Sequence, residues 1–110
     1  MQNLKTTIDE GKLALSTEPG KLFAQLMQHG SMTIEYYAPQ GADLQTPHQQ
    51  DELYVIASGT GIFSRDGVRV PFAPGDVLFV PAGMEHRFEQ FSTDFATWVI
   101  FYGPEGGEQP

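Results

Sequence analysis

Two short segments carry the residue types that could do chemistry. Residues 48–52 read His-Gln-Gln-Asp-Glu, and residues 75–86 read Gly-Asp-Val-Leu-Phe-Val-Pro-Ala-Gly-Met-Glu-His. They supply two imidazoles and a carboxylate on sequence typical of β-strands, and these groups are common ligands of divalent transition metals. The sequence therefore predicts a metal site formed by His48, Glu52 and His86.

The spacing of these segments resembles the two motifs of the cupin superfamily, small β-barrels that usually hold one divalent metal. The first family motif reads Gly, five residues, His-x-His, three or four residues, Glu, six residues, Gly, and its counterparts here are Gly41, His48, Glu52 and Gly59. The second reads Gly, five residues, Pro-x-Gly, two residues, His, three residues, Asn, and its counterparts are Gly75, Pro81, Gly83 and His86, with Gln90 at the Asn position. The resemblance covers residues 30–102 and implies an all-β fold, a single double-stranded β-helix of the jelly-roll-like cupin type.

The chain departs from the family pattern at one ligand. If His48 is the second histidine of the first motif, the first falls at Thr46, which has no nitrogen donor. Side chains two residues apart share a face of a strand, so an unbulged strand would direct Thr46, His48, Gln50 and Glu52 inward. Gln50 could then offer a carbonyl oxygen, whereas Gln45 could do so only if a bulge reversed the alternation. Which of the three replaces the missing histidine stays open.

The same alternation bears on whether His48 and Glu52 can bind the same ion. On an unbulged strand His48 and Glu52 lie about 13 Å apart along the chain, so they meet at one ion only if the strand curves or the side chains converge. Glu52 shares the parity of Tyr54 and Ile56 in an otherwise apolar run. Facing the interior unpaired, its carboxylate would cost several kcal/mol or take up a proton, and a cation removes that cost.

The rest of the chain reads as short strands separated by Gly and Pro turns, typical of a sandwich or barrel. Residues 21–28 could also form a short helix, but we favour a strand, and Asp66-Gly67 is a strong hairpin signal. We expect one domain over residues 1–102, with the motifs within 41–90 and a disordered tail at 103–110. The expected strands are 12–16, 21–28, 31–38, 52–57, 62–64, 68–72, 76–80, 85–91 and 95–102.

Composition excludes several classes of function. The 110 residues contain no cysteine, which rules out disulfides and thiolate ligands, so a metal here must be held by N and O donors. The formal net charge of -8 repels polyphosphate, and we expect no nucleic-acid partner. No apolar run is long enough to span a membrane, and residues 1–5 lack the apolar region of a signal peptide. We therefore expect a soluble, cytoplasmic protein.

Two functions fit these residues and the resemblance. The first is a metal-dependent dioxygenase or isomerase acting on a small organic molecule in the barrel, with one divalent ion (Fe, Mn, Ni, Co, Cu or Zn). Two histidines and one carboxylate also form the facial triad of non-haem Fe(II) oxygenases. The alternative is a noncatalytic, metabolite-binding cupin. Single-domain family members commonly pair, so we expect a homodimer packed through Leu13, Leu15, Phe23 and Leu26.

Overall fold

The computed structural model describes residues 4–109, which form two antiparallel sheets and one helix. Residues 1–3, which belong to the segment 1–5 expected to lack a signal peptide, and residue 110 lie outside the described residues. Over residues 4–109 no helix is long and apolar enough to cross a membrane. The elements are α1 (Ile8–Leu15), β1 (Phe23–His29), β2 (Met32–Tyr37), β3 (Asp51–Ser58), β4 (Gly61–Arg65), β5 (Val68–Phe72), β6 (Val77–Val80), β7 (His86–Glu89) and β8 (Ala96–Tyr102).

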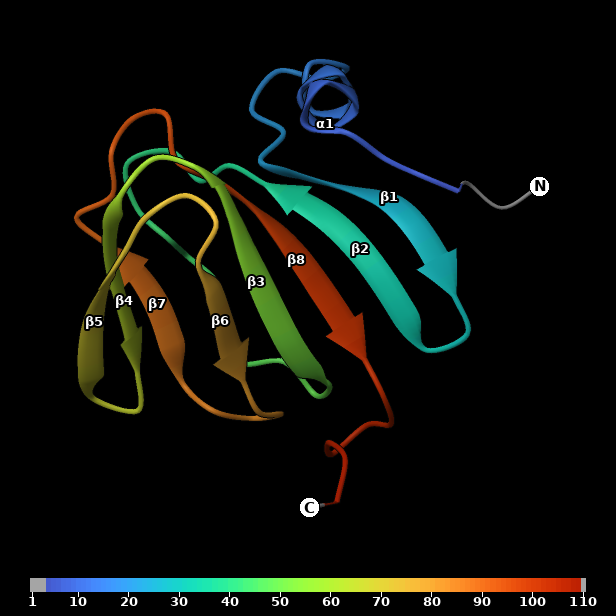
Figure 1. Cartoon of the computed structure of the whole chain (residues 1–110), viewed down its shortest axis with the longest axis vertical. Coiled ribbons are helices and arrows are strands. Elements are labelled where there is room, and N and C mark those ends of the chain that lie inside the picture. Colours follow the sequence, from blue (N-terminus) through green and yellow to red (C-terminus); the bar gives the residue numbers. More distant parts are fainter. Residues whose placement is uncertain (1–3, 110) are drawn as a thin grey trace.

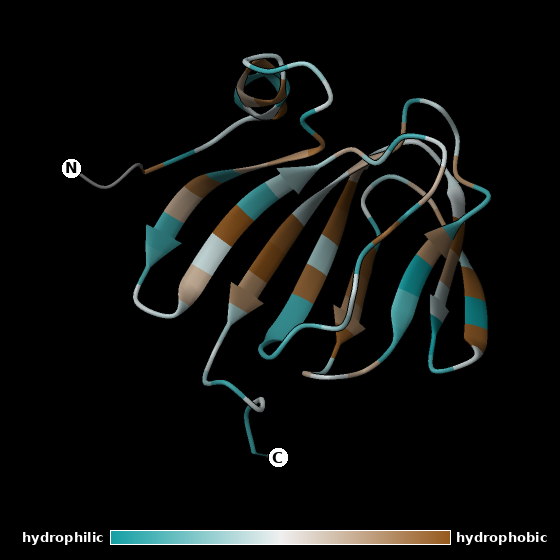
Figure 2. Ribbon diagram, turned by 180° about the vertical axis from the view of Figure 1, so that it is seen from behind, coloured by the Kyte–Doolittle hydropathy of each residue, from teal (hydrophilic) through white to brown (hydrophobic). Residues whose placement is uncertain are grey.

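The two sheets pack face to face and enclose an aromatic core. One has the strand order β1-β2-β8-β3-β6 and the other β5-β4-β7, as Figure 1 shows. Along β3 every second residue points inward, and apolar and polar bands accordingly alternate along the strands in Figure 2. This arrangement confirms the predicted all-β barrel class. The core consists of Tyr37, Tyr54, Ile56, Phe63, Phe72, Val80, Phe88, Phe95 and Val99.

The hairpin between β4 and β5 forms where the sequence predicts it. Arg65 pairs with Val68 across a two-residue turn, and the turn residues Asp66 and Gly67 have φ angles of 49° and 83°. Positive φ at both central positions is the hairpin turn that matches strand twist, which is why Asp-Gly is such a strong signal.

The strand expected at residues 12–16 is wrong, because this segment lies at the end of α1. The helix begins after Thr7, whose hydroxyl accepts a hydrogen bond from the Glu10 amide at 3.1 Å and lies 3.1 Å from the Glu10 carboxylate. Asp9 and Glu10 also place negative charge at the positive end of the helix. The sequence Thr-x-x-Glu signals the start of a helix, and a strand prediction based on residues 12–16 does not take it into account.

Residues 103–109, for which the sequence predicts disorder, are hydrogen-bonded to the start of β3. The Gly106 amide donates to the Gln49 carbonyl at 2.7 Å, and the Glu108 amide donates to Asp51 Oδ2 at 2.9 Å. Asp51 is buried and therefore needs such donors. The segment is thus attached to the strand that carries Glu52.

We predict that Gly11→Ala destabilises the fold although alanine is the better helix former. A Cβ at Gly11 would lie 2.6 Å from Cγ of Tyr36, so α1 could not keep its contact with β2. Overpacking of this kind costs about 1–3 kcal/mol, more than the roughly 1 kcal/mol gained in helix propensity. Chemical denaturation measures the change. Lys12→Ala, at the exposed neighbouring position, should shift stability by less than about 0.5 kcal/mol, and a Gly11→Ala variant as stable as wild type would contradict the prediction.

Candidate metal centre

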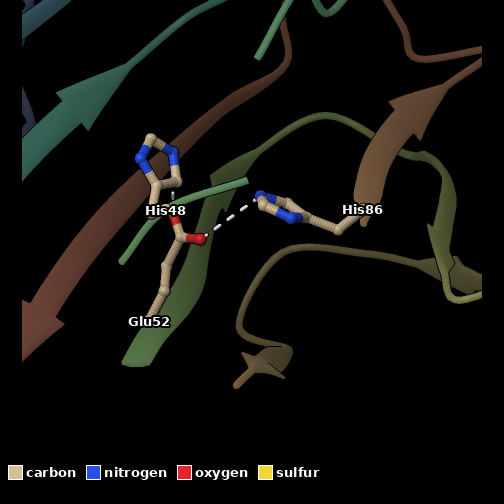
Figure 3. Close-up of side chains that lie close together, drawn as sticks. All are labelled: His48, Glu52 and His86. Carbon is tan, nitrogen blue, oxygen red and sulfur yellow. Dashed lines mark ion pairs between the residues drawn. The ribbon is translucent and has the colours of Figure 1, made fainter. Parts of the chain in front are cut away.

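The structure brings His48, Glu52 and His86 together. One ligand atom from each residue lies within 4.8 Å of the other two, and Figure 3 shows the three side chains pointing toward one another. Nε2 of His86 is 3.2 Å from Glu52 Oε1, and Nε2 of His48 is 4.0 Å from Glu52 Oε2. Glu52 and His86 are buried, while the His48 side chain is 36% exposed. The cluster therefore lies at the edge of the interior, open to a ligand on the His48 side.

His48 reaches this position because the chain before β3 is not a strand. Residues 43–48 are irregular and β3 begins only at Asp51, so the separation of about 13 Å expected on an unbulged strand does not apply. The His48 carbonyl accepts a hydrogen bond from the Gly83 amide at 2.7 Å, and the Asp51 carboxylate accepts one from the Ala82 amide at 2.9 Å. The turn that leads into His86 is thereby tied to the segment that carries His48.

Glu52 faces inward from β3. It pairs with Val80 of β6 on one side and with Phe101 of β8 on the other, so its carboxylate is surrounded by the inner row of three strands. The His48 ring packs edge-on against Phe101, with ring centroids 4.7 Å apart. The parity argument from the sequence placed Glu52 on the correct face.

His86 is oriented by the backbone of its own turn. Nδ1 donates a hydrogen bond to the Met84 carbonyl at 2.9 Å, because a carbonyl oxygen only accepts. In the neutral ring this leaves the lone pair of Nε2 facing the Glu52 carboxylate, an arrangement that repels unless a cation lies between them. Burial lowers the pKa of His86, but the nearby Glu52 carboxylate and the hydrogen bond to the Met84 carbonyl outweigh it, and the pKa is raised. The place between the two groups thus favours a positive charge.

The donor atoms fit a divalent transition metal. Nε2 of both histidines and both carboxylate oxygens of Glu52 are buried, and the structure gives none of them a hydrogen-bond partner. Buried polar atoms are normally satisfied, so four such atoms in one cluster point to an ion as the partner. Two nitrogens and one carboxylate suit Fe, Mn, Co, Ni, Cu or Zn and leave coordination positions open. The cluster could hold one such ion.

The three residues that could replace the missing motif histidine as a metal ligand, Gln50, Gln45 and Thr46, have different surroundings. The Gln50 amide nitrogen donates to the carbonyls of Ser31 and Gly103, so its side chain points away from the interior face on which an unbulged strand would have placed it. The side-chain oxygen of Gln45 accepts from the Tyr54 hydroxyl at 3.0 Å. Thr46 lines the cavity beside His48.

Asp43, which the sequence did not single out, holds this segment to the barrel. Its carboxylate is buried and accepts hydrogen bonds from the Tyr37 hydroxyl, the Phe88 amide, and both the backbone and side-chain amides of Gln45, at 2.7–3.2 Å. Four donors offset the cost of burying the charge. An acidic residue in a short irregular segment gives no signal of such a network, which joins residues far apart in sequence.

A cavity of about 810 Å³ opens beside His48. Its walls are largely apolar, and it reaches the loop between α1 and β1. A second cavity, of about 510 Å³, lies on another side of His48, so the ring borders both. The first is lined in part by Leu22, Tyr37, Thr46, His48, Val99 and Phe101.

Glu35 of β2 also lines the larger cavity, and sequence reasoning overlooked it. Burial, and then the nearby Glu52 charge, raise the pKa of its carboxyl group. Strand parity with the buried Tyr37 could have revealed that Glu35 faces inward.

We predict that Glu35→Gln changes how stability depends on pH. Because the folded-state pKa of Glu35 is raised, its contribution to stability is fully present below the unfolded-state pKa and is lost as pH rises through the folded-state pKa. In metal-free protein the variant should therefore match wild type below about pH 4 and become the more stable of the two toward neutral pH. Urea denaturation across this range measures the difference. Asp94→Asn, which removes an exposed carboxylate, should show no such divergence.

Comparisons with known proteins agree with this geometry. The family model described as Cupin domain matches residues 33–102. The chain is 34% identical over 85 residues to an uncharacterized protein of Streptomyces coelicolor, covering 76% of this chain and 81% of that protein. It is 39% identical over 79 residues to an acireductone dioxygenase of Leishmania infantum, covering 57% of this chain but 23% of that protein. The chain thus spans about a quarter of the length of that enzyme.

Solved structures show the same fold. A Cupin 2 conserved barrel domain protein from Salinispora arenicola superimposes with a TM-score of 0.67 at 19% identity, covering 94% of this chain and 90% of that one. The family match extends over residues 33–102 and includes both motif segments. The chain therefore belongs to the cupin family.

Proposed function

We propose that His48, Glu52 and His86 bind one divalent transition metal and that the adjoining cavity receives a small organic molecule, on which the protein acts as a dioxygenase or isomerase. The observation that carries this proposal is the buried cluster of ligand atoms within 4.8 Å that lack hydrogen-bond partners. A bound divalent cation would polarise a carbonyl or enolate oxygen of the ligand. The apolar walls contributed by Val99 and Phe101 would exclude water and position the carbon skeleton.

The similarity to acireductone dioxygenases supports the dioxygenase form of the proposal, although the matched region is a minor part of those enzymes. Thr46, at the position of the absent motif histidine, instead favours the noncatalytic alternative, a metabolite-binding cupin without turnover. Oxygen uptake separates the two. Protein loaded with Fe(II) and supplied with an acireductone should consume oxygen if it is a dioxygenase, and Glu52→Gln should lose that activity.

We predict that metal stabilises the fold by mass action. Free metal at about a hundred times the dissociation constant contributes roughly 2.7 kcal/mol, which for a domain of this size raises the melting midpoint by on the order of 10 °C. His86→Ala should abolish most of this shift, because it removes a ligand, and Glu52→Gln should reduce it by weakening the attraction to the cation. Differential scanning calorimetry with each of the six candidate ions measures the shift.

The matched control is His29→Ala, which removes a histidine at the end of β1 that is not part of the cluster and should keep the full shift. Elemental analysis of protein purified without a metal-affinity tag independently measures how many metal ions are bound per chain. A wild type with no shift for any ion, or a His86→Ala variant that retains the shift, would show that the site is assigned wrongly.

We also propose that the protein forms a homodimer. The edge strand expected at residues 12–16 is a helix, but Leu13 and Phe23 of the proposed interface are exposed. The outer face of the larger sheet adds an apolar surface. On this face, apolar residues that are partners in the strand pairing form rows across β2, β8, β3 and β6. Its two rows are Ile34, Ile100, Leu53 and Phe79, and Trp98, Val55 and Val77; Tyr36, which continues the second row, is buried beneath α1 and is not part of this surface.

Light scattering at micromolar concentration should therefore give twice the chain mass of 12.2 kDa. Val77→Lys should shift the equilibrium toward monomer, because it places a charge on an apolar face that a second copy would cover. Asp94→Asn, a change at an exposed position of the loop between β7 and β8, serves as control. A wild-type protein with the mass of a single chain would contradict the homodimer proposal.

A further inference from the structure

We propose that Glu35 is the acid–base group of this site and that it takes the hydroxyl proton of a neutral hydroxyketone, a small molecule with a hydroxyl next to a carbonyl group. The inference rests on the proposed function, since it assumes that the ligand lies between Glu35 and the metal centre. The inference adds Glu35, a residue that would contact the ligand, to the three proposed metal ligands, and it names the chemical class of the ligand.

The strand register places Glu35 on the same inner surface as Glu52. Glu35 pairs with Val99 of β8, and Val99 pairs with Tyr54 of β3, two residues along from Glu52. The Cα atoms of Glu35 and Glu52 thus lie about 10 Å apart across the sheet and about 7 Å apart along it. Glu35 lines the same cavity as His48, so a small ligand beside the metal centre would be within reach of its carboxylate.

The Glu35 carboxylate differs from the acidic groups that serve the fold. Asp43 accepts four hydrogen bonds and Asp51 accepts two from backbone amides, as expected of buried structural carboxylates. Within residues 4–109 the Glu35 side chain has no hydrogen bond and no ion pair, although it is partly buried. A carboxylate without a partner on the wall of a cavity destabilises the empty protein and is suited to a ligand.

No nearby cation neutralises Glu35 in the part of the chain that the structure describes. Lys21 lines the same cavity, but its ammonium lies 4.0 Å from the Glu18 carboxylate and donates to the Thr17 hydroxyl at 3.5 Å. Burial, the first cause of the raised pKa of Glu35, does not depend on whether a metal is present. Glu35 is therefore able to exchange a proton at moderate pH.

The charge of the chain indicates which form of ligand arrives. A net charge of -8, together with Glu35 on the cavity wall, disfavours entry of an anion. A neutral hydroxyketone enters without that penalty and loses its proton inside. The ligand O–H bond breaks, the electron pair stays on the ligand oxygen, and the proton forms a new O–H bond on the Glu35 carboxylate. The oxyanion then faces the cluster of His48, Glu52 and His86.

The test counts protons when a probe binds. Protein loaded with Co(II) is titrated with maltol, a neutral hydroxyketone, by calorimetry at several pH values from mildly acidic to mildly alkaline, each in two buffers of different ionisation enthalpy. Toward the acidic end wild type should release fewer protons to the buffer than Glu35→Gln does, because Glu35, whose pKa is raised, keeps part of them. Glu35→Gln should release about one proton per maltol bound at every pH, whereas the release from wild type should rise toward one as the pH rises. Asp94→Asn should behave as wild type does.

Each other outcome overturns a distinct statement. If wild type binds no Co(II), the proposed function fails before Glu35 is tested. If Co(II) binds and proton release is the same in wild type and Glu35→Gln, Glu35 is not the proton acceptor. Loss of Co(II) from Glu35→Gln would make Glu35 a metal ligand instead. Failure of the loaded wild type to bind maltol would remove the hydroxyketone as ligand class.

Discussion

The structure depends on the burial of one negative charge, the carboxylate of Glu52. It lies on the inner face of β3 with no hydrogen-bond donor on either oxygen, and a bare carboxylate in such a place would destabilise the barrel by several kcal/mol. The Nε2 atoms of His48 and His86 lie 4.0 and 3.2 Å from its two oxygens. Each imidazole comes from a different segment, so the need for positive charge around Glu52 links the chain before β3 to the turn before β7.

The buried and partly buried acidic groups discussed above fall into two kinds. Asp43 and Asp51 accept several hydrogen bonds each, and they attach the segment before β3 and residues 103–109 to the barrel. Glu52 and Glu35 face the interior with no such donors. Because a carboxylate that loses hydration needs another partner, the difference lies in what satisfies each kind: protein hydrogen-bond donors for the first pair and, in our proposal, a cation and a ligand for the second.

Much of the fold could be predicted from local signals. Short runs bounded by Gly and Pro turns predicted the strands from β1 to β8, and Asp66-Gly67 predicted the β4–β5 hairpin, because both signals depend on neighbouring residues only. The helix α1 was missed although Thr7 and Glu10 form a helix start, since the apolar residues after them also suit a strand. Residues 103–109 looked featureless because their partners, Gln49 and Asp51, lie more than fifty residues earlier in the chain.

By itself the sequence determined the chemical types at the site and the face that Glu52 occupies, because side-chain alternation along a strand is a local property. Tertiary structure decided which of those groups meet. His48 reaches Glu52 because the chain before Asp51 leaves the strand and its carbonyl bonds to Gly83, and for the same reason Gln50 turns toward Ser31. Glu35 enters the cavity through the pairing of β2 with β8, which joins residues more than sixty positions apart. Spacing within a motif carries no information about such long-range register.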